Sequence, residues 1–149
     1  MANTNLIKEL RDKTQMSIKE IKKALEEAGD DVEKALGFLK KQGAKIAEKR
    51  AEKEAKQGIV EAYIHGNGKM GALIDLRSET DFVARNEQFK QLAHDIAMQV
   101  ASMDPKDVDE LMSQPFIKNQ DLTIDELIKE YIGKLGEKIK VERFIRFSL

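Results

Sequence analysis

Cysteine and tryptophan are absent from this sequence of 149 residues, and aromatic residues make up only 5% of it. Without a thiol, the chain has no disulfide bond, no thiolate nucleophile and no cysteine-ligated zinc ion. No apolar run approaches the ~20 residues of a membrane-spanning helix, and residues 1–5 lack the pattern of a signal peptide. We therefore expect a cytoplasmic protein that does not bind membranes.

An excess of charge of one sign is also absent. The 26 lysine and arginine residues nearly balance the 27 aspartate and glutamate residues, which leaves a net charge of -1. A partner recognised through its phosphate backbone would require a basic surface. The balance therefore argues against direct binding of nucleic acid and favours a soluble interaction protein.

Residues 1–43 have the pattern of three short amphipathic helices. Polar caps precede each apolar stripe, and glycines follow the second and third stripes. The expected cap and stop residues are Thr4 or Asn5, Ser17 with Glu20, Gly29, Asp30 or Asp31, and Gly43. Three helices of this length bury only a minimal core, so this part is expected to be marginally stable alone.

Residues 44–57 are rich in helix-forming residues and in charges of both signs, with almost no apolar face. This pattern is typical of a solvated helical linker. A nucleic-acid-binding arm is the alternative interpretation, but the interleaved glutamates argue against it.

Residues 58–149 have the pattern of an α+β core. Two strand-like runs, 59–64 and 70–76, flank a turn with glycine and asparagine, which predicts a hairpin. Helices are expected after Asn86 and after Thr123, and the chain closes with a strand over residues 138–147. We therefore predict a three-stranded antiparallel sheet with helices on one face.

The closing strand is amphipathic on both sides. By simple alternation, one face should carry Ile139, Val141, Arg143, Ile145 and Phe147, and the other Lys140, Glu142, Phe144 and Arg146. Since both faces include apolar residues, the face of the sheet without helices is expected to need a partner.

No catalytic constellation is evident. His65 and His94 have no ligand-type neighbour at helical spacing, and Asp75 with Glu79 resembles an ordinary solvated pair of acids at a strand end. The glycines of residues 66–71 fall within a hairpin and not between a strand and a helix, so they do not form a phosphate-binding loop. We expect no metal, no cofactor and no enzymatic activity.

Residues 79–86, Glu-Thr-Asp-Phe-Val-Ala-Arg-Asn, lie between a strand and a capped helix. In one interpretation Thr80 or Asp81 caps a turn and Phe82 packs into the core. In the other, Asp81 and Phe82 form an exposed tip held by rigid elements. The residues alone do not decide between them.

The chain resembles elongation factor Ts over nearly its whole length. The resemblance rests on residues 6–11, 21–28, 80–86, 136–139 and 143–147, taken in order, and the segment Thr-Asp-Phe-Val-Ala after a hairpin is its most specific part. It implies that residues 1–43 form a ubiquitin-associated-like (UBA-like) domain, residues 44–57 a linker and residues 58–149 the core and dimerisation domain.

The resemblance also implies a guanine nucleotide exchange factor for elongation factor Tu, a GTPase. Two groups of residues would contact the GTPase domain: Arg11, Ile18, Lys19 and Lys22 in the helical part, and Thr80, Asp81, Phe82 and Val83 in the core. The tip would separate helices beside the magnesium and phosphate site of Tu and release GDP, with no covalent chemistry. Relatives usually carry Gly-Ala-Gly-Met-Met where this chain has Gln-Met-Ser-Ile-Lys at residues 15–19.

Two departures from the family concern assembly. The core occurs once here and not twice, and residues 104–113 are compressed. Because short members of the family pair through their sheets, the resemblance implies a homodimer with a sheet-on-sheet contact.

Three other functions stay open from the sequence. An adapter would capture a ubiquitin-like or helical protein with residues 1–43, and failure to bind Tu would favour it. An RNA-binding accessory factor using residues 44–57 would show steep salt dependence. A small metabolic enzyme would need a pocket with convergent polar groups.

Overall fold

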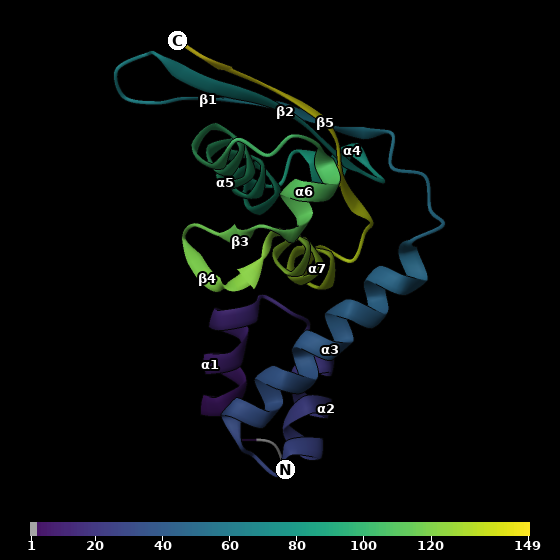
Figure 1. Ribbon diagram of the computed structural model, residues 1–149. Helices are drawn as coiled ribbons and strands as arrows, with labels where there is room; N and C mark the ends of the chain where they lie inside the picture. Colours follow the sequence, from purple (N-terminus) through teal and green to yellow (C-terminus); the bar gives the residue numbers. More distant parts are fainter. Residues whose placement is uncertain (1–2) are drawn as a thin grey trace.

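The computed structural model describes residues 3–149 and has the predicted α+β architecture. Figure 1 shows a three-stranded sheet at one end of the molecule, a layer of helices beneath it, and the N-terminal helices at the other end. The C-terminus lies at the sheet end and the N-terminus at the far end (Figure 1). Within residues 3–149, no helix is long and apolar enough to cross a membrane.

Three helices form the N-terminal head: α1 (Thr4–Thr14), α2 (Ile18–Ala28) and α3 (Val32–Arg50). The Ser17 and Asp31 side chains cap α2 and α3 as predicted, and Gly29 ends α2 in the left-handed conformation. The cap of α1 is Asn3, whose side chain accepts from the Asn5 amide, so the prediction of Thr4 or Asn5 was wrong.

The predicted end of the third helix at Gly43 was also wrong, because α3 continues through that residue to Arg50. Gly43 lies where α3 crosses α7 (Ile124–Leu135), close to Gly133 of that helix. The glycine therefore serves a close helix crossing and not a helix end. Ile46 and Ala47, in the part expected to be a solvated linker, pack against the core.

The sheet contains β1 (Gln57–Ile64), β2 (Met70–Ser78) and β5 (Ile139–Ser148), all antiparallel, with β2 in the middle. The predicted hairpin is confirmed: the His65 amide donates to the Met70 carbonyl, and Gly68 adopts a φ of 75° in the turn. This positive φ is the conformation for which glycine is favoured.

The predicted facing of β5 was wrong in its second half. A register shift between Asp75 and Leu76 pairs these residues with Arg143 and Val141, which leaves Glu142 as an extra residue. An inserted residue reverses the alternation beyond it. Ile145 and Phe147 therefore lie on the outer face, 48% and 69% exposed, while Phe144 packs against the core.

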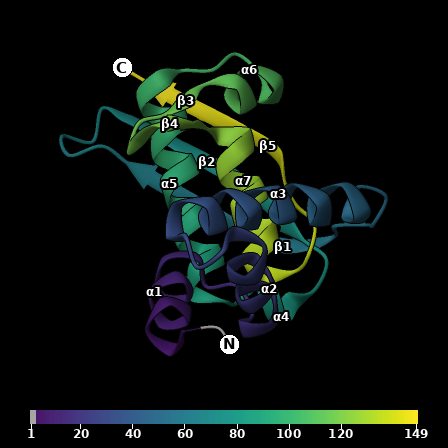
Figure 2. The same cartoon turned by 90° about the horizontal axis from the view of Figure 1, so that it is seen from below.

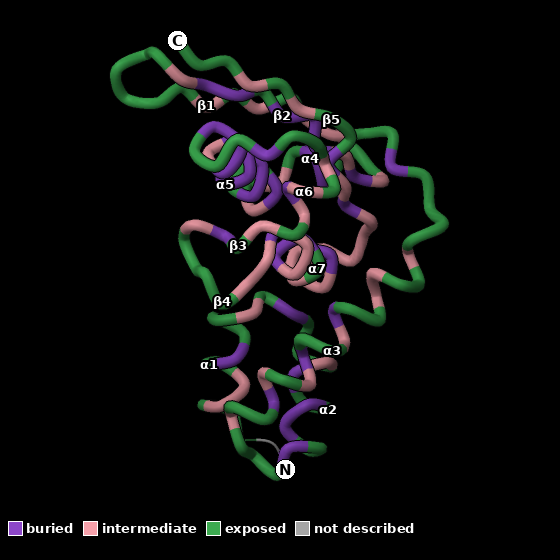
Figure 3. The backbone as a smooth tube through the Cα atoms, in the orientation of Figure 1, coloured by how far each residue is buried: buried purple, intermediate pink, exposed green. Residues whose placement is uncertain are grey.

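Helices cover the inner face of the sheet. They are the single turn α4 (Asp81–Ala84), the long α5 (Glu87–Met103), α6 (Val108–Ser113) and α7. A small hairpin of β3 (Pro115–Phe116) and β4 (Asn119–Thr123), which the sequence analysis did not predict, precedes α7. Figure 3, which colours the chain by residue burial, shows buried segments in α5, β2 and α7 and others in the head helices.

The hydrophobic residues form two clusters. One lies between α1, α2 and α3, and the other lies between the sheet, α5 and α7. Ile46 of α3 packs against both. The division into residues 1–43, 44–57 and 58–149 stays a prediction. The helix α3 runs through the first of these boundaries without a break.

Candidate protein-binding site

The segment after β2 forms an exposed tip. Thr80 caps α4, and its hydroxyl accepts a hydrogen bond from the Val83 amide at 3.3 Å. Phe82 is 85% exposed, while Val83 and Ala84 are 5% and 1% exposed. The structure therefore has Phe82 outside the core, as in the second interpretation given above.

The geometry of one helical turn explains why Phe82 points outward. Successive residues of a helix are rotated by about 100°, so residues 83 and 84 cannot both face the core while residue 82 does. Since Val83 and Ala84 anchor α4 to the core, Phe82 is directed to solvent. Val83, which was predicted to contact the partner, is in this structure an anchor of the turn.

Asp81 lies beside Phe82 and is also exposed. Its carboxylate forms an ion pair with Arg85 at 2.8 Å, one turn further along. The tip, which we define as Asp81 and Phe82, thus presents an acid and an aromatic ring side by side. A protruding aromatic residue next to a charge is the kind of anchor that dominates many protein interfaces.

The four predicted residues of the head are all exposed. Arg11 lies in the last turn of α1, and Ile18, Lys19 and Lys22 lie in the first turns of α2. Ile18 is 46% exposed, because the opposite face of α2 buries Ile21 and Leu25. We call these four exposed side chains the head surface.

The head surface and the tip are not in contact. Figure 1 places α2 and α4 far apart along the length of the molecule, whereas Figure 2, seen along that length, places them toward the same edge. A single large partner on that side would therefore reach both. The structure does not bring them together into one pocket.

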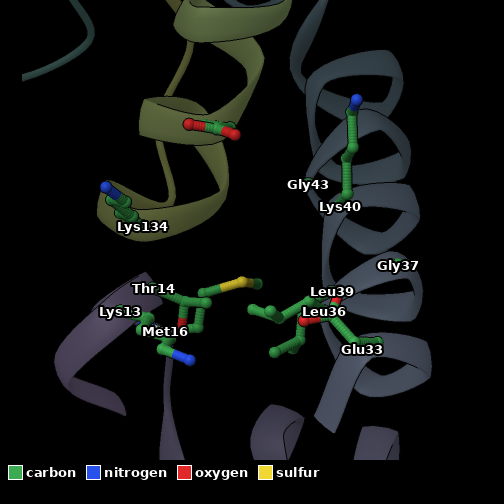
Figure 4. A pocket seen from close by; sticks show the side chains of 11 residues that line it. Lys13, Thr14, Met16, Glu33, Leu36, Gly37, Leu39, Lys40, Gly43 and Lys134 are labelled. Atoms are coloured by element: carbon green, nitrogen blue, oxygen red, sulfur yellow. Dashed lines mark hydrogen bonds between the residues drawn. The ribbon is translucent and has the colours of Figure 1, made fainter. Parts of the chain in front are cut away.

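A cavity of about 380 Å³ lies between the head and the core. Met16 and Leu39 line its apolar part, and Lys40 of α3 and Lys134 of α7 lie on opposite sides of it (Figure 4). Glu130 also lines the cavity, and burial raises the pKa of its carboxyl despite the nearby lysines. None of the predicted partner-binding residues lines this cavity.

The outer face of the sheet carries exposed apolar residues in two cross-strand rows. One row pairs Ile64 with Gly71 and Gly71 with Phe147, and the next joins Ala62, Leu73 and Ile145. A hollow of about 410 Å³ lies over these rows, at the hairpin end of the sheet. The expectation of an apolar second face is confirmed, although the bulge at Glu142 decides which residues of β5 belong to it.

The acids and histidines that the sequence analysis considered have other roles. Asp75 is buried and not solvated: Arg77 donates to both carboxylate oxygens at 2.6 and 3.0 Å, and Arg143 donates at 3.2 Å. Tyr63 joins the two histidines, with its hydroxyl 3.1 Å from Nδ1 of His65 and its ring 5.8 Å from that of His94. Among residues 3–149, no group of three or more acids and histidines is placed to hold a metal ion.

Sequence reasoning missed the residues beneath the tip. Glu137, which is 57 positions from Thr80, accepts hydrogen bonds from that residue, and Arg50 pairs with Glu79. No local pattern indicates such contacts, because they join segments that only the fold brings together.

The fold is that of an α+β protein with a helical head and a core that carries a projecting tip. The family model described as "Elongation factor TS" matches residues 79–149, which include the tip. Curated relatives extend the similarity to the whole chain. This chain belongs to the elongation factor Ts family, and it has a role in translation elongation.

Three relatives illustrate the similarity, and each is called "Elongation factor Ts". The protein of Carboxydothermus hydrogenoformans is 37% identical over 194 residues, which cover 100% of this chain and 89% of the relative. That of Coprothermobacter proteolyticus is 39% identical over 192 residues, 99% of this chain and 98% of the relative. That of Nostoc is 45% identical over 147 residues, 99% of this chain but 46% of the relative.

The length of the first alignment shows that this chain lacks residues that the Carboxydothermus protein has. Because it has 149 residues, at least 45 of the 194 aligned positions of the Carboxydothermus protein fall opposite a gap. The position of the gap within residues 104–113 stays a prediction.

Proposed function

We propose that this chain is a guanine nucleotide exchange factor for elongation factor Tu and promotes the release of GDP from it. The observation that carries this proposal is the tip, in which an 85% exposed phenylalanine projects beside an acid from a turn anchored by buried residues. A ring held outward in this way is available to enter another protein, whereas a ring packed in the core would not be.

The head supplies a second contact to the GTPase domain of Tu. Its residues would be Arg11, Ile18, Lys19 and Lys22, with Ile18 as the apolar anchor and the basic side chains around it. Because α2 and α4 lie toward the same edge of the molecule (Figure 2), one GTPase can meet both. Two separated contacts also orient the tip relative to the nucleotide site.

The mechanism requires no covalent chemistry. A GTPase holds the phosphates of GDP with backbone amides at a helix N-terminus and with a magnesium ion. Entry of Phe82 and Asp81 between elements beside that site displaces them, so the phosphates lose partners and GDP dissociates faster. Since the coupling between two ligands is reciprocal, incoming GTP weakens the binding of the factor in turn, and the factor is released.

The test is the rate of release of fluorescent GDP from Tu, followed by stopped flow. The double variant Asp81→Ala/Phe82→Ala is expected to bind Tu through its head but to release GDP about 100-fold more slowly than the wild type at saturation. Arg85→Ala is the matched control, since it removes the ion pair to Asp81 and leaves both tip side chains in place. Equal acceleration by the double variant and the wild type would refute the mechanism.

We further propose that a second copy of the chain covers the outer face of the sheet. The two apolar rows lie at the hairpin end of this face, next to a charged region of Asp75, Arg77 and Arg143. One half of the face is therefore apolar and the other half is charged. A two-fold axis through the apolar half pairs like with like, and it buries Ile64, Leu73 and Phe147 of both copies. Sedimentation should give a dimer for the wild type and a monomer for Phe147→Asp; a monomeric wild type at micromolar concentration would refute the proposal.

A further inference from the structure

The tip depends on contacts outside its own turn. With four residues, α4 is far too short to be stable as an isolated helix, since a helix of this length closes almost no internal hydrogen bonds. Val83 and Ala84 fix its distance from the core. Its orientation needs a further constraint at its start, where the chain leaves β2.

Glu137 supplies that constraint. Its Oε1 accepts from the Thr80 amide at 2.9 Å, and its Oε2 accepts from the Thr80 hydroxyl at 2.8 Å. A hydroxyl has one proton to donate, and here Glu137 accepts it. The hydroxyl oxygen is therefore turned toward the Val83 amide, from which it accepts the hydrogen bond that caps α4.

The backbone places Glu137 opposite Thr80. Gly136 ends α7 with a φ of 74°, a conformation that turns the chain sharply and that glycine adopts without strain. Glu137 follows at once, before β5 begins at Ile139. The connection between α7 and β5 thus lies against the connection between β2 and α4.

The residues next to Thr80 and Glu137 make a similar contact with the roles exchanged: here the segment after β2 supplies the carboxylate and the segment before β5 supplies the amide. Glu79, which precedes Thr80, accepts from the Lys138 amide at 2.6 Å and from Arg50 of α3 at 3.1 Å. The Lys138 ammonium donates in turn to the Ala51 carbonyl at 2.7 Å. Two adjacent residues of one connection therefore bind two adjacent residues of the other, and the end of α3 is tied to both.

We propose that Glu137 is a positioning residue for nucleotide exchange: it holds the Thr80 cap so that Asp81 and Phe82 project at a fixed angle. The inference rests on the proposed function above. Glu137 lies at the base of the turn and is only half-buried, so the hydrophobic core closes without it. Loss of the Glu137 side chain therefore changes the direction in which Asp81 and Phe82 project, while the chain still folds.

The experiment compares GDP release from Tu by the wild type, Glu137→Ala and Glu137→Gln. Removing both acceptors with alanine is expected to lower the maximal rate of release about tenfold while the concentration for half-maximal rate changes less than about twofold. Glutamine keeps a carbonyl oxygen for the Thr80 amide and should recover part of the rate. Glu54→Ala is the control, because that exposed carboxylate pairs with Lys56 alone among residues 3–149.

A second readout reports the turn itself. Hydrogen exchange of the Val83 and Ala84 amides in the free protein should accelerate in Glu137→Ala and stay unchanged in Glu54→Ala. If Glu137→Ala fails to fold, Thr80→Ala against Thr80→Ser tests the same contact from the other side, since serine keeps the hydroxyl. The rate of GDP release should fall only in the variants that lose the Thr80 hydroxyl or its acceptor on Glu137.

The outcomes separate the two proposals. A wild type that accelerates GDP release together with a Glu137→Ala variant that does so equally well would overturn the positioning role alone. A wild type that does not accelerate release overturns the proposed function, and the positioning role with it. A variant whose maximal rate falls in step with a large loss of melting temperature would mark Glu137 as merely structural and would also overturn the inference.

Discussion

Gly43 of α3 and Gly133 of α7 meet at the crossing that joins the head to the core. A Cβ built on Gly133 would lie 3.0 Å from the Cα of Gly43, and one built on Gly43 would lie 3.3 Å from the Lys129 carbonyl oxygen. Both neighbours are backbone atoms, which cannot turn aside as a flexible side chain does. The distance between the two helices is therefore set by the absence of two side chains.

Gly133→Ala is expected to destabilise the protein by about 1–3 kcal/mol, because the added methyl group forces α3 and α7 apart. Gly37→Ala is the matched control in α3: a Cβ there meets nothing within 4 Å. Replacing an exposed helical glycine by alanine should stabilise by about 0.5–1 kcal/mol. Urea unfolding of both variants measures the difference, and a stability of Gly133→Ala equal to that of the wild type would contradict the close crossing.

The charge on Asp75 should make the free energy of unfolding depend on pH. The hydrogen bond from Arg77, together with Arg143, holds the pKa of the Asp75 carboxyl below its ordinary value, although burial opposes the shift. A depressed pKa contributes stability that is present above the ordinary value and is lost as the pH falls through the folded value. Asp75→Asn is therefore expected to cost about 1–3 kcal/mol at pH 7 and progressively less below about pH 4.

The measurement is urea unfolding of the wild type and Asp75→Asn across a pH series. Asp12→Asn, at an exposed position of α1, is the control and should stay within about 0.5 kcal/mol of the wild type. A difference between the wild type and Asp75→Asn that is the same at pH 3 and pH 7 would show that the carboxylate charge is not the cause.

Two glutamates one turn apart on α7 should respond oppositely to neutralisation. Burial raises the pKa of the Glu130 carboxyl. In contrast, Lys40 forms an ion pair with Glu126 at 3.0 Å, and the hydrogen bond from Lys40 lowers the pKa of the Glu126 carboxyl. A raised pKa in an acid means that the folded state loses stability as the pH rises through the folded value. A lowered one means that stability is lost as the pH falls.

Glu130→Gln is therefore expected to raise the unfolding free energy at pH 7, and Glu126→Gln to lower it. The effect at Glu130 should vanish below the ordinary glutamate pKa of about 4.3. The effect at Glu126 should vanish only below its lowered folded-state pKa, where that carboxyl is protonated in the folded and unfolded states alike. Thermal unfolding at pH 7 and at pH 3 measures the two variants side by side. Shifts of the same sign at pH 7 would contradict the assignment.

Gln99 is a polar residue inside the core. It is fully buried, donates to the Gln114 side chain and the Pro115 carbonyl, and accepts from the Ile117 amide at 3.0 Å. Gln99→Ala leaves these groups without partners and should cost about 2–4 kcal/mol. Gln91→Ala, at an exposed position of the same helix, removes one hydrogen bond to Asp95 and should cost only about 0.5–1.5 kcal/mol.

Calorimetry of Gln99→Ala and Gln91→Ala checks this prediction. We expect the hairpin of β3 and β4 to lose amide protection first in the Gln99 variant, because Gln99 is what ties Pro115 and Ile117 to α5. Equal melting temperatures for the two variants would show that another contact holds the hairpin.

Local signals in the sequence predicted most elements correctly, because caps and turns depend on neighbouring residues. Ser17 caps α2, Gly29 ends α2, and Asp31 caps α3, each as predicted. The same reasoning failed at Gly43, where a glycine that resembles a helix stop is required by another helix 90 positions further along. It also failed at Glu142, since nothing in β5 alone indicates an extra residue.

The sequence by itself determined the helices, the hairpin, the family and the residues of the tip, because capping, alternation and a distinctive segment are all readable along the chain. Only the tertiary structure decided which way these residues face. Val83 and Ala84 pack inward and so turn Phe82 outward, and the bulge in β5 moves Ile145 and Phe147 to the uncovered face. Direction is a property of what each segment packs against, and those neighbours are distant in sequence.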